Sequence, residues 1–414
     1  MRLSPLHSRR PFRLRFLAAA LLASCSLAPA AQAQDAAARA ARTLATCTPA
    51  APCDSPLPVK VVVVSLFEIG EDEGDTAGEF QLWKERRGLT TRIPFPQGFH
   101  DLYYNPDTQV LGVVTGIGTA RSTAATMALG LDDRLDLTQA YWLVAGIAGI
   151  DPQDASIGSV ALARYVVDGD LAHEIDAREI PADWDFGYFA RGTQGPHDTR
   201  TPLDPSGGEV FQINPSLEQW AFALTRDIAL PDTPEIARER ASFTGFPKAL
   251  EPPRVLEGEQ LSAMTFWHGA RMTDWANHWV RQWTGGKGEF VTSAMEDTGI
   301  LQAMTYLDAA SRADRDRVLV LRAGSNFTMP PPGTDAASYL LRENEATPGS
   351  RRRWRTSTRW VRYWSMNCWG TGSGIPRQHP DESKRDSRGH HPLPPYPSTS
   401  PFPANVAETG EVDW

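Results

Sequence analysis

Runs of apolar residues, each bounded by turn-forming residues, divide the middle of the chain into short strands and helices. The run KVVVVSLF at residues 60–67 is continuous rather than alternating, which is typical of a strand buried on both faces, as in a parallel sheet. Three further strands are predicted at residues 110–114, 140–144 and 160–167, and small apolar residues at 119–131 predict a buried helix between the first two of these. This alternation predicts an α/β fold, a three-layer αβα sandwich around a mixed, mainly parallel central sheet.

The second half of the chain has weaker patterns. Residues 170–257 are rich in Pro, Asp and Arg, so we expect loops and helices that cap the sheet. Residues 261–283 are predicted to be helical, and two more strands are predicted at 290–294 and 318–321. Four tryptophans are spaced to fall on one face of the expected helix: Trp267, Trp275, Trp279 and Trp283. We interpret this face as core packing, with a ring stacked on a ligand's base as the alternative.

Residues 1–33 have the organisation of an export signal rather than of a folded element. The basic stretch SRRPFRLR precedes an apolar run at residues 16–23, and AQA at 31–33 offers a small-residue cleavage site. The stretch SRRPF at 8–12 is similar to a twin-arginine signal, and LASC, which ends at Cys25, has the form of a lipoprotein cleavage box. We therefore expect a periplasmic protein exported by a Sec- or Tat-type signal, with a lipid on Cys25 as the alternative to simple cleavage.

The segment after the signal is predicted to be a linker, since residues 34–57 are rich in Ala and Pro. Within it, Cys47 and Cys53 flank a short Pro-containing loop and either form a local disulfide or stay free thiols. The Cys and His residues have no zinc-like spacing, so no metal site is expected. No segment beyond the signal reaches the roughly 20 apolar residues that cross a bilayer, so we expect that this chain alone cannot form a membrane channel.

The charge of the chain argues against nucleic acid as a partner. The formal net charge is −9, and the signal contains five arginines but no Asp or Glu, so its removal leaves about −14. A surface with this excess of acid repels phosphate backbones.

Two glycine segments, each predicted to form a turn, follow predicted strands directly. Gly116 and Gly118 come after the strand at 110–114, and Gly146 and Gly149 come after the strand at 140–144. In an open α/β sheet, ligands bind at the carboxyl ends of the strands, and glycines there let backbone N–H groups approach a phosphate or a ribose. Two tight turns without a ligand are the alternative.

Several stretches around these glycines resemble the core of the nucleoside phosphorylase and nucleosidase superfamily. They are TGIGTARSTAAT from residue 115, YWLVAGIAGIDPQDASIGSVALARYVVDGD from 141, AMEDTG from 294 and RAGSN from 322. Within that superfamily, KVVVVSLFEIG, GEFQLW and SNFTMPPPG resemble the purine nucleoside permease family. The resemblance spans about residues 58–345 and implies a nucleoside-phosphorylase-like domain, which we expect over residues 58–349.

The resemblance also implies a set of substrate-binding residues. Glu296 matches the carboxylate that grips the ribose hydroxyls, and Met295 would pack against the sugar. Asn326, after Ser325, takes the position of the base-contacting Asp or Asn, where it could act in catalysis by hydrogen bonding to the departing base. The glycines of both segments, Gly116, Gly118 and Gly146, would complete the site with Ile147. The alternatives are an acid at a helix N-terminus for Glu296 and a turn residue for Asn326.

The nucleophile is the least defined part of the expected site. Phosphorylases often carry a hydroxyl residue where this chain has Ile147, so phosphate as a co-substrate is in doubt and no other cofactor is expected. Water as the nucleophile, or binding without cleavage, becomes the stronger interpretation. Glu68, Glu71 and Asp72 lie in the loop after the first strand and could supply a catalytic base, with a solvated acidic loop as the alternative.

Two functions follow from this resemblance. The first is an exported enzyme that binds purine nucleosides and cleaves their N-glycosidic bond by phosphorolysis or hydrolysis, in connection with nucleoside uptake. The second is a periplasmic binding protein that hands nucleosides to a separate membrane transporter without cleaving them. The base preference and a homo-oligomeric state are left open by the sequence.

Residues 350–414 differ in composition from everything before them. They are rich in Arg, Trp, Ser and Pro and lack a helix or strand period, which indicates a disordered tail or a shifted reading frame. Synonymous codons for residues 353–370, read one base earlier, can spell ALENLYAVGAVLVDELLG, which has the pattern of an amphipathic helix. We therefore predict a frameshift near residue 350, with a genuine basic tail as the alternative.

Overall fold

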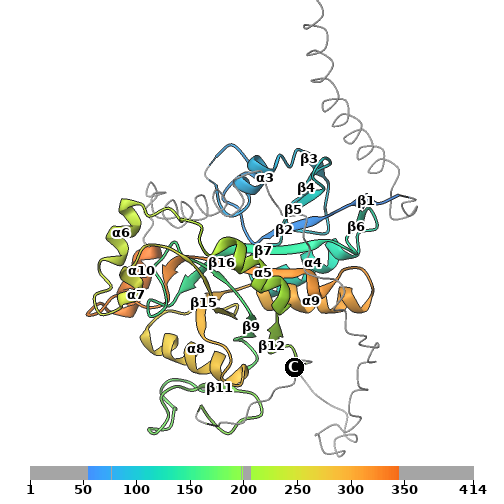
Figure 1. Ribbon diagram of the computed structural model, residues 1–414. Coiled ribbons are helices and arrows are strands. Elements are labelled where there is room, and N and C mark those ends of the chain that lie inside the picture. Colours follow the sequence, from blue (N-terminus) through green and yellow to red (C-terminus); the bar gives the residue numbers. More distant parts are fainter. Residues whose placement is uncertain (1–54, 76, 197, 199–206, 345–414) are drawn as a thin grey trace, which may run out of the picture. The chain divides into compact units, whose positions relative to one another are not determined.

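The computed structural model describes residues 55–75, 77–196, 198 and 207–344 (Figure 1). The predicted export signal, Cys25, the Cys47–Cys53 pair, most of the linker and the tail from residue 350 lie outside the described residues. No described helix is long and apolar enough to span a membrane.

A mixed sheet forms the centre of the fold. Its main path runs β12-β9-β14-β15-β7-β2-β5-β4-β3, and β8, β13 and β16 are attached beside β7. These strands are β2 (Val61–Ser65), β3 (Thr91–Ile93), β4 (Leu102–Asn105), β5 (Val110–Val114), β7 (Tyr141–Ile150), β8 (Val160–Leu162), β9 (Tyr165–Asp168), β12 (Val210–Gln212), β13 (Val255–Glu257), β14 (Glu259–Ser262), β15 (Phe290–Ala294) and β16 (Val318–Phe327). Two small sheets pair β1 (Leu57–Pro58) with β6 (Leu135–Asp136) and β10 (Ala172–Glu174) with β11 (Tyr188–Ala190).

Strand β7 changes its neighbour along one edge. Its first residues, 141–144, pair in parallel with β2, whereas Gly149 and Ile150 pair antiparallel with β15. On the other edge, β16 runs parallel to β7 from Trp142 to Ile150. Residues 145–148 of β7 therefore face a fork where β2 has ended and β15 has not begun, and none of the described strands pairs with them there.

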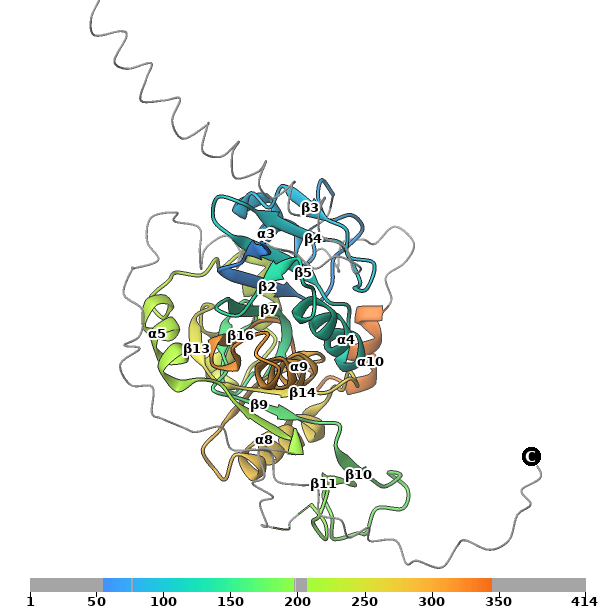
Figure 2. The same cartoon turned by 90° about the vertical axis from the view of Figure 1, so that its right-hand side faces the viewer.

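Helices cover both faces of this sheet. In Figure 2, α5 lies on one side of the central strands and α4 lies on the other, next to α9. A Cβ at Gly299 of α9 would lie 2.5 Å from the carbonyl oxygen of Thr119, so α4 and α9 are in close backbone contact. The described helices are α3 (Gln81–Arg87), α4 (Thr119–Gly130), α5 (Pro215–Thr225), α6 (Pro234–Arg240), α7 (Pro247–Leu250), α8 (Ala270–Trp283), α9 (Asp297–Ala309) and α10 (Ala336–Asn344), with a 3₁₀ turn at Arg315–Arg317.

The predicted fold class is confirmed, and four elements lie where the sequence predicts them. These are β2, β5, α4 and β15. The central strands are close to fully buried, with Val62, Val64 and Val144 at 0 % exposure, as the continuous apolar runs indicated. Parallel pairs join β2, β5, β7 and β16, whereas β3, β4 and β8 are attached by antiparallel pairs.

Other boundaries were wrong. The strands predicted at 140–144 and 318–321 continue to Ile150 and Phe327, because β7 and β16 pair with each other through their glycines. The strand predicted at 160–167 is two strands, β8 and β9. They separate at Arg164, where the N–H groups of Arg164 and Tyr165 donate to the buried Glu259 carboxylate instead of continuing one ladder.

The region from 170 to 283 contains more strand than predicted. Four strands, β10 to β13, lie in the part expected to hold only loops and helices. The expected helix at 261–283 is strand β14, a loop and then α8, which begins after Gly269 at a φ of 126°. Three of the four tryptophans pack as core on α8: Trp275, Trp279 and Trp283 are each 1 % exposed, and the Trp279 indole donates to the Asp168 carbonyl at 2.7 Å. The prediction was wrong for Trp267, which lies in the loop before α8 and is partly buried.

Candidate functional site

A fully buried arginine lies at the centre of the candidate site. Arg322 is on β16, and its Nη2 donates to Asp297 Oδ1 at 2.8 Å and to Glu296 Oε2 at 3.1 Å. Its Nε donates to the same Asp297 oxygen at 3.1 Å, and its Nη1 donates to the carbonyl oxygen of Ile147 at 3.1 Å. A guanidinium with 1 % exposure needs such partners, because an unpaired buried charge is strongly destabilising.

Glu296 connects this arginine to the first glycine segment. It is the residue directly before α9, in the short connection from β15, and its Oε1 accepts the N–H of Gly118 at 3.2 Å. Oε2 accepts the N–H of Met295 at 3.2 Å, and the side chain of Ser122 donates to the Glu296 carbonyl at 3.0 Å. Burial raises the pKa of Glu296 above its ordinary value, although Arg322 opposes this. The start of α4 and the end of β15 are therefore held together at the carboxyl ends of their strands.

A third carboxyl group, Glu79, faces the same arginine from the fork in the sheet. Its Oε2 accepts the N–H of Leu66, the residue after β2, at 2.7 Å. Its Oε1 accepts the N–H of Ile147, on β7, at 2.8 Å. Burial raises the pKa of Glu79 to about 8, with Glu296 adding to the rise and Arg322 opposing it. Glu79 is thus a buried acid that gains or loses its proton at a pH near 8.

Together these residues form what we call the Arg322 cluster: Arg322, Glu79, Glu296 and Asp297. Three carboxyl groups surround one guanidinium, and Asp297 Oδ2 has no hydrogen-bond partner among the described residues. With all three acids ionised the cluster would hold an excess of two negative charges in a region of low dielectric, which favours keeping a proton. Among the described residues, no group of three or more His, Cys, Asp or Glu side chains could hold a metal ion.

The two glycine segments that the sequence predicted lie on either side of this cluster. Gly116 and Gly118 have φ values of 88° and 92°, in the left-handed region, and form a turn between β5 and α4. Gly146 lies inside β7, where a Cβ would be 2.5 Å from Arg322 Nη1 and 2.8 Å from Glu79 Oε1. The prediction of a turn at the second segment was therefore wrong, because its glycine makes room for buried charge within a continuous strand.

Asn326 and Ser325 lie on β16, beyond Arg322. The hydroxyl of Ser325 donates to Asn326 Oδ1 at 2.9 Å, and Asn326 Nδ2 donates to the Phe327 carbonyl at 3.2 Å. In the sheet register, Asn326 pairs with Gly149, and Gly149 pairs on its other side with Ser293 of β15. Two strand spacings, about 10 Å, therefore separate Asn326 from the end of β15 that leads to Glu296.

Glu68 is engaged in local structure. Its carboxylate accepts the backbone N–H groups of Ile69 at 2.7 Å, Phe80 at 2.7 Å and Gln81 at 2.5 Å, and that of Gly78 as well. These bonds fold the loop after β2 and satisfy the free N–H groups at the start of α3. A role for Glu68 as a catalytic base stays a prediction.

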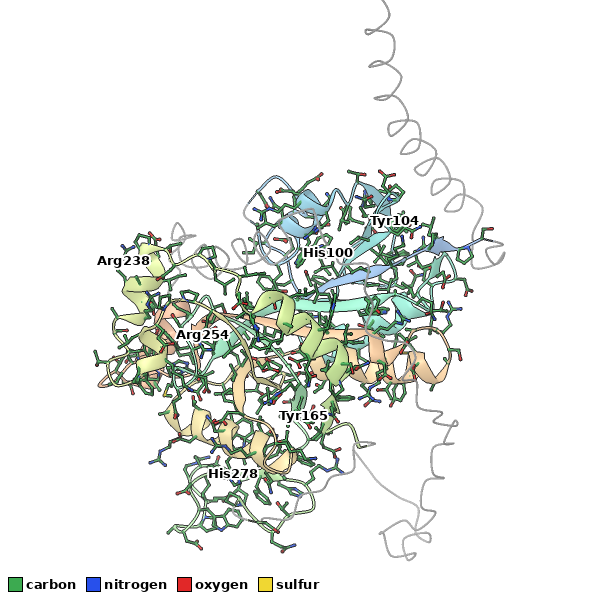
Figure 3. The ribbon with its side chains drawn as sticks, in the orientation of Figure 1. His100, Tyr104, Tyr165, Arg238, Arg254 and His278 are labelled. Atoms are coloured by element: carbon green, nitrogen blue, oxygen red, sulfur yellow. The ribbon has the colours of Figure 1, made fainter. Side chains whose placement is uncertain are left out.

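Glu71 lies apart from Glu68. It is exposed and lines an open pocket of about 320 Å³. The other lining residues are Gly70, Asp72, Arg92, His100, Asp101 and Tyr103. Figure 3 shows His100 in this upper part of the molecule, near the β3–β4 hairpin that carries Tyr104. A catalytic role for Glu71 likewise stays a prediction.

Sequence reasoning missed Glu79, Asp297 and Arg322, although all three stand within stretches that carried the resemblance. Glu79 lies in GEFQLW, Asp297 in AMEDTG and Arg322 in RAGSN. The pattern that could have found them is a charged residue inside a strand as apolar as VLVLRAG, since a charge buried in such a strand requires partners of opposite sign.

The fold and the cluster define an α/β protein with a buried, acid-rich site at the carboxyl ends of its central strands. The sequence profile of the purine nucleoside permease (NUP) family matches residues 58–363. The chain belongs to this family.

Curated relatives match over most of the domain. A purine nucleoside permease of Candida albicans is 28% identical over 290 residues, which are 69% of this chain and 69% of the relative. A probable purine nucleoside permease of Schizosaccharomyces pombe is 27% identical over 250 residues, which are 59% of this chain and 71% of the relative.

Among solved structures, two matches of low sequence identity are a nucleosidase and a hydrolase. The 5′-methylthioadenosine/S-adenosylhomocysteine nucleosidase of Neisseria meningitidis is 15% identical, with a TM-score of 0.40 over 74% of this chain and 99% of the nucleosidase. The futalosine hydrolase of Helicobacter pylori is also 15% identical, with a TM-score of 0.41 over 74% of this chain and 97% of the hydrolase. The assignment to the family rests on the sequence match.

Proposed function

We propose that this chain binds purine nucleosides at the Arg322 cluster and hydrolyses their N-glycosidic bond. The names of its relatives support a purine nucleoside as the ligand. The observation that carries the proposal is that one buried guanidinium faces two carboxyl groups suited to different tasks. Glu296 is bonded to the glycine turn and Glu79 to the fork of the sheet.

Glu296 is the ribose-binding residue in this proposal. A carboxylate accepts hydrogen bonds from two neighbouring hydroxyl groups, and such charge-assisted bonds are among the stronger ones in proteins. Arg322 fixes one of its oxygens and the N–H of Gly118 fixes the other, so its orientation is set before a ligand arrives. A negative charge beneath the sugar also stabilises the positive charge that develops on the ribose as the bond to the base breaks.

Water is the nucleophile that this site supports best. Phosphate would need free N–H groups at the glycine segments, but the N–H of Gly118 is bonded to Glu296 and that of Ile147 to Glu79. A phosphate dianion at either place would also meet carboxylates of its own sign. Burial raises the pKa of Glu79 to about 8, which suits a general base at neutral pH.

The proposed reaction is balanced without a cofactor. The oxygen of water bonds to C1′ of the ribose, the C1′–N9 bond breaks, and the water proton passes to Glu79. The electron pair of the broken bond leaves with the purine, which takes a proton from solvent, and Glu79 then returns the proton from water to solvent. Asn326 has no proton to transfer, and its amide contributes by donating a hydrogen bond to the departing base.

The test is release of free base from inosine or adenosine by the purified mature protein, with and without phosphate. We expect release in both conditions, and a loss of nucleoside affinity in Glu296→Gln. Glu235→Gln, which changes a side chain on the outer surface of α6, is the matched control. Release that requires phosphate would refute hydrolysis, and unchanged affinity in Glu296→Gln would remove Glu296 from the site.

A second candidate is binding without cleavage, in a component that passes nucleosides to a separate membrane transporter. The observation in its favour is Asn326, an amide where a proton donor would assist departure of the base. Calorimetry separates the two candidates, since tight binding of intact inosine without release of hypoxanthine over hours supports the binding component.

We also infer from residues 1–33 that the protein is exported to the periplasm. Mass spectrometry of the N-terminus after cell fractionation tests this. Cleavage after Ala33 or lipidation of Cys25 would support export, and an intact N-terminus in the cytoplasmic fraction would contradict it.

A further inference from the structure

Three exposed apolar side chains surround the Gly116–Gly118 turn. Ile117, between the two glycines, is 44% exposed, Phe99 is 52% exposed and Met264 is 47% exposed. A Cβ at Gly116 would lie 3.2 Å from Phe99 Cγ, and a Cβ at Gly118 would lie 3.4 Å from Met264 Cε. The same turn gives the Gly118 N–H to Glu296, so these side chains are continuous with the Arg322 cluster. Exposed apolar side chains gathered in one place indicate a surface that receives a ligand or partner.

Phe99 is held in place by its neighbour in the sequence. Its ring is stacked on His100, with ring centroids 4.8 Å apart and an angle of 24° between the planes. His100 Nδ1 lies 2.7 Å from Asp72 Oδ1, and both side chains are partly buried. Asp72 belongs to the loop after β2 and His100 to the loop before β4, so this pair ties two loops together.

The charges around the pair favour its ionised form. The hydrogen bond that His100 donates to the Asp72 carboxylate raises the pKa of His100 above its ordinary value, and the charges of Asp72, Glu68 and Asp101 add to the rise. Burial alone would raise the pKa of Asp72, but the hydrogen bond and charge of His100 outweigh it and hold that pKa below its ordinary value. Two further groups that face Asp72, Tyr103 and Lys84, lower its pKa as well.

We propose that Phe99 contacts the bound nucleoside and that His100 and Asp72 are the positioning pair that holds its ring over the glycine turn. This inference rests on the proposed function. The Phe99 ring beside Gly116 offers a flat apolar face. Purines stack on such faces with little dependence on the identity of the base. The occupant is the nucleoside, because the ring adjoins the turn that is bonded to the ribose-binding Glu296.

Titration of the full mature protein with inosine tests the contact. Phe99→Ala is expected to weaken binding about ten-fold, and Phe99→Tyr, which keeps the ring, is expected to bind within about two-fold of the wild type. Tyr306→Ala is the matched control, since it removes an aromatic ring that is similarly exposed, at 55%, but lies on α9.

The possible outcomes are distinct. Absence of binding by the wild type would overturn the proposed function and, with it, this inference. Binding by the wild type with unchanged affinity in Phe99→Ala would overturn this inference alone. A Phe99→Ala variant that changes the sedimentation coefficient but not the affinity would show that a second copy of the chain covers the ring, which also overturns it.

The positioning pair is tested by pH. The bond of protonated His100 to Asp72 is fully present below the ordinary histidine pKa of about 6.5 and is lost as pH rises through the raised pKa of the folded protein. Wild-type affinity should therefore fall in that range, and the part due to His100 should vanish in Asp72→Asn. Arg178→Gln, which removes the exposed Arg178–Asp176 pair away from this loop, should keep the full dependence. An Asp72→Asn profile equal to that of the wild type would overturn the positioning role.

Discussion

The two glycine segments of the site look alike in the sequence and are physically different. Gly116 and Gly118 are required by their backbone angles, because both lie in the left-handed region between a strand and a helix. Gly146 has ordinary strand geometry and is required by what lies above its Cα, since Arg322, Leu66 and Glu79 occupy the space of a side chain. The first segment shapes the chain and the second makes a space for charge. Glycine after an apolar run therefore indicates either a turn or a place where another residue's side chain packs against the backbone. The two cases can be separated only by knowing which residue lies against the glycine.

The largest expected effect comes from removing the charge that the second segment accommodates. Arg322→Met should lower the free energy of unfolding by about 3–5 kcal/mol at pH 7, because three buried carboxyl groups lose the guanidinium that they face. Denaturant unfolding checks this. Arg281→Met is the control, since its pair with Glu289 is exposed and should contribute less than about 1 kcal/mol. A loss in Arg322→Met no larger than in the control would mean that the cluster is not held by the arginine.

A second effect is the dependence of stability on pH. Burial raises the pKa of Glu79 to about 8 in the folded state, against 4.5 when it is exposed. The folded protein keeps a proton that the unfolded chain has lost, so stability is fully present below pH 4.5 and falls as pH rises towards 8. The slope is at most about 1.4 kcal/mol per pH unit for this one group. Thermal unfolding of Glu79→Gln from pH 5 to 9 should show a shallower slope, and an unchanged slope would exclude Glu79 as its source.

The steric argument for Gly146 is tested by adding one methyl group. Gly146→Ala should cost about 1–3 kcal/mol through overpacking, because a Cβ there would lie 2.5 Å from both Arg322 Nη1 and Leu66 Cδ2 and 2.8 Å from Glu79 Oε1. Combining it with Leu66→Ala should cost less than the sum of the two changes, because the truncated Leu66 no longer occupies one of the two nearest positions. Strict additivity in denaturant unfolding would contradict the packing explanation.

Gly118 should respond differently to the same substitution. Gly118→Ala is expected to cost about 1–2 kcal/mol, because its φ of 92° is unfavourable for any residue with a Cβ. Its nearest side chain is the flexible end of Met264, at 3.4 Å, so the added Met264→Ala change should not relieve the cost. Relief by that second change would show that Gly118 is required for space, as Gly146 is.

The smallest effect is expected at Gly149, the last glycine of the second segment. A Cβ there would lie 3.2 Å from Thr328 Cγ2 and 3.4 Å from Asn326 Nδ2, contacts that a small shift can accommodate. Gly149→Ala should therefore change the free energy of unfolding by less than about 1 kcal/mol, partly because alanine reduces the entropy of the unfolded chain. A loss comparable to that of Gly146→Ala would mean that β7 tolerates no side chain anywhere along this segment.

Strands could be predicted from the sequence where a local run of residues is enough to determine them. The continuous valine run predicted β2, because a strand buried on both faces requires apolar residues at every position, and shorter apolar stretches predicted β5 and β15. The lengths of β7 and β16 could not be predicted, since Gly146, Gly149 and Gly324 carry no strand propensity by themselves. They are strand residues because the two strands pair with each other, which is a property of residues more than 170 positions apart.

The candidate site was predictable only in part for the same reason. Glu296 could be identified by its motif, whereas the ion pair that orients it links two residues 26 positions apart. Glu79 and Glu68 are both acids of one loop, and nothing local distinguishes them. One faces a distant arginine, and the other is bonded to the N–H groups of its own loop. The difference depends on the course of the chain between them.

The fork in the sheet gives Glu79 a mechanical position. Where β2 ends and β7 continues without a neighbour on that edge, the Glu79 carboxyl group accepts the N–H of Leu66, just after β2, and the N–H of Ile147, on β7. Across the gap, the Glu79 carboxyl oxygens accept the backbone N–H groups that a neighbouring strand would otherwise bond. A gain or loss of the Glu79 proton changes the strength of both hydrogen bonds together, so a protonation change at the cluster alters how firmly β2 and β7 are joined across the gap. The rates at which the Leu66 and Ile147 amides exchange with deuterium measure the strength of these two bonds.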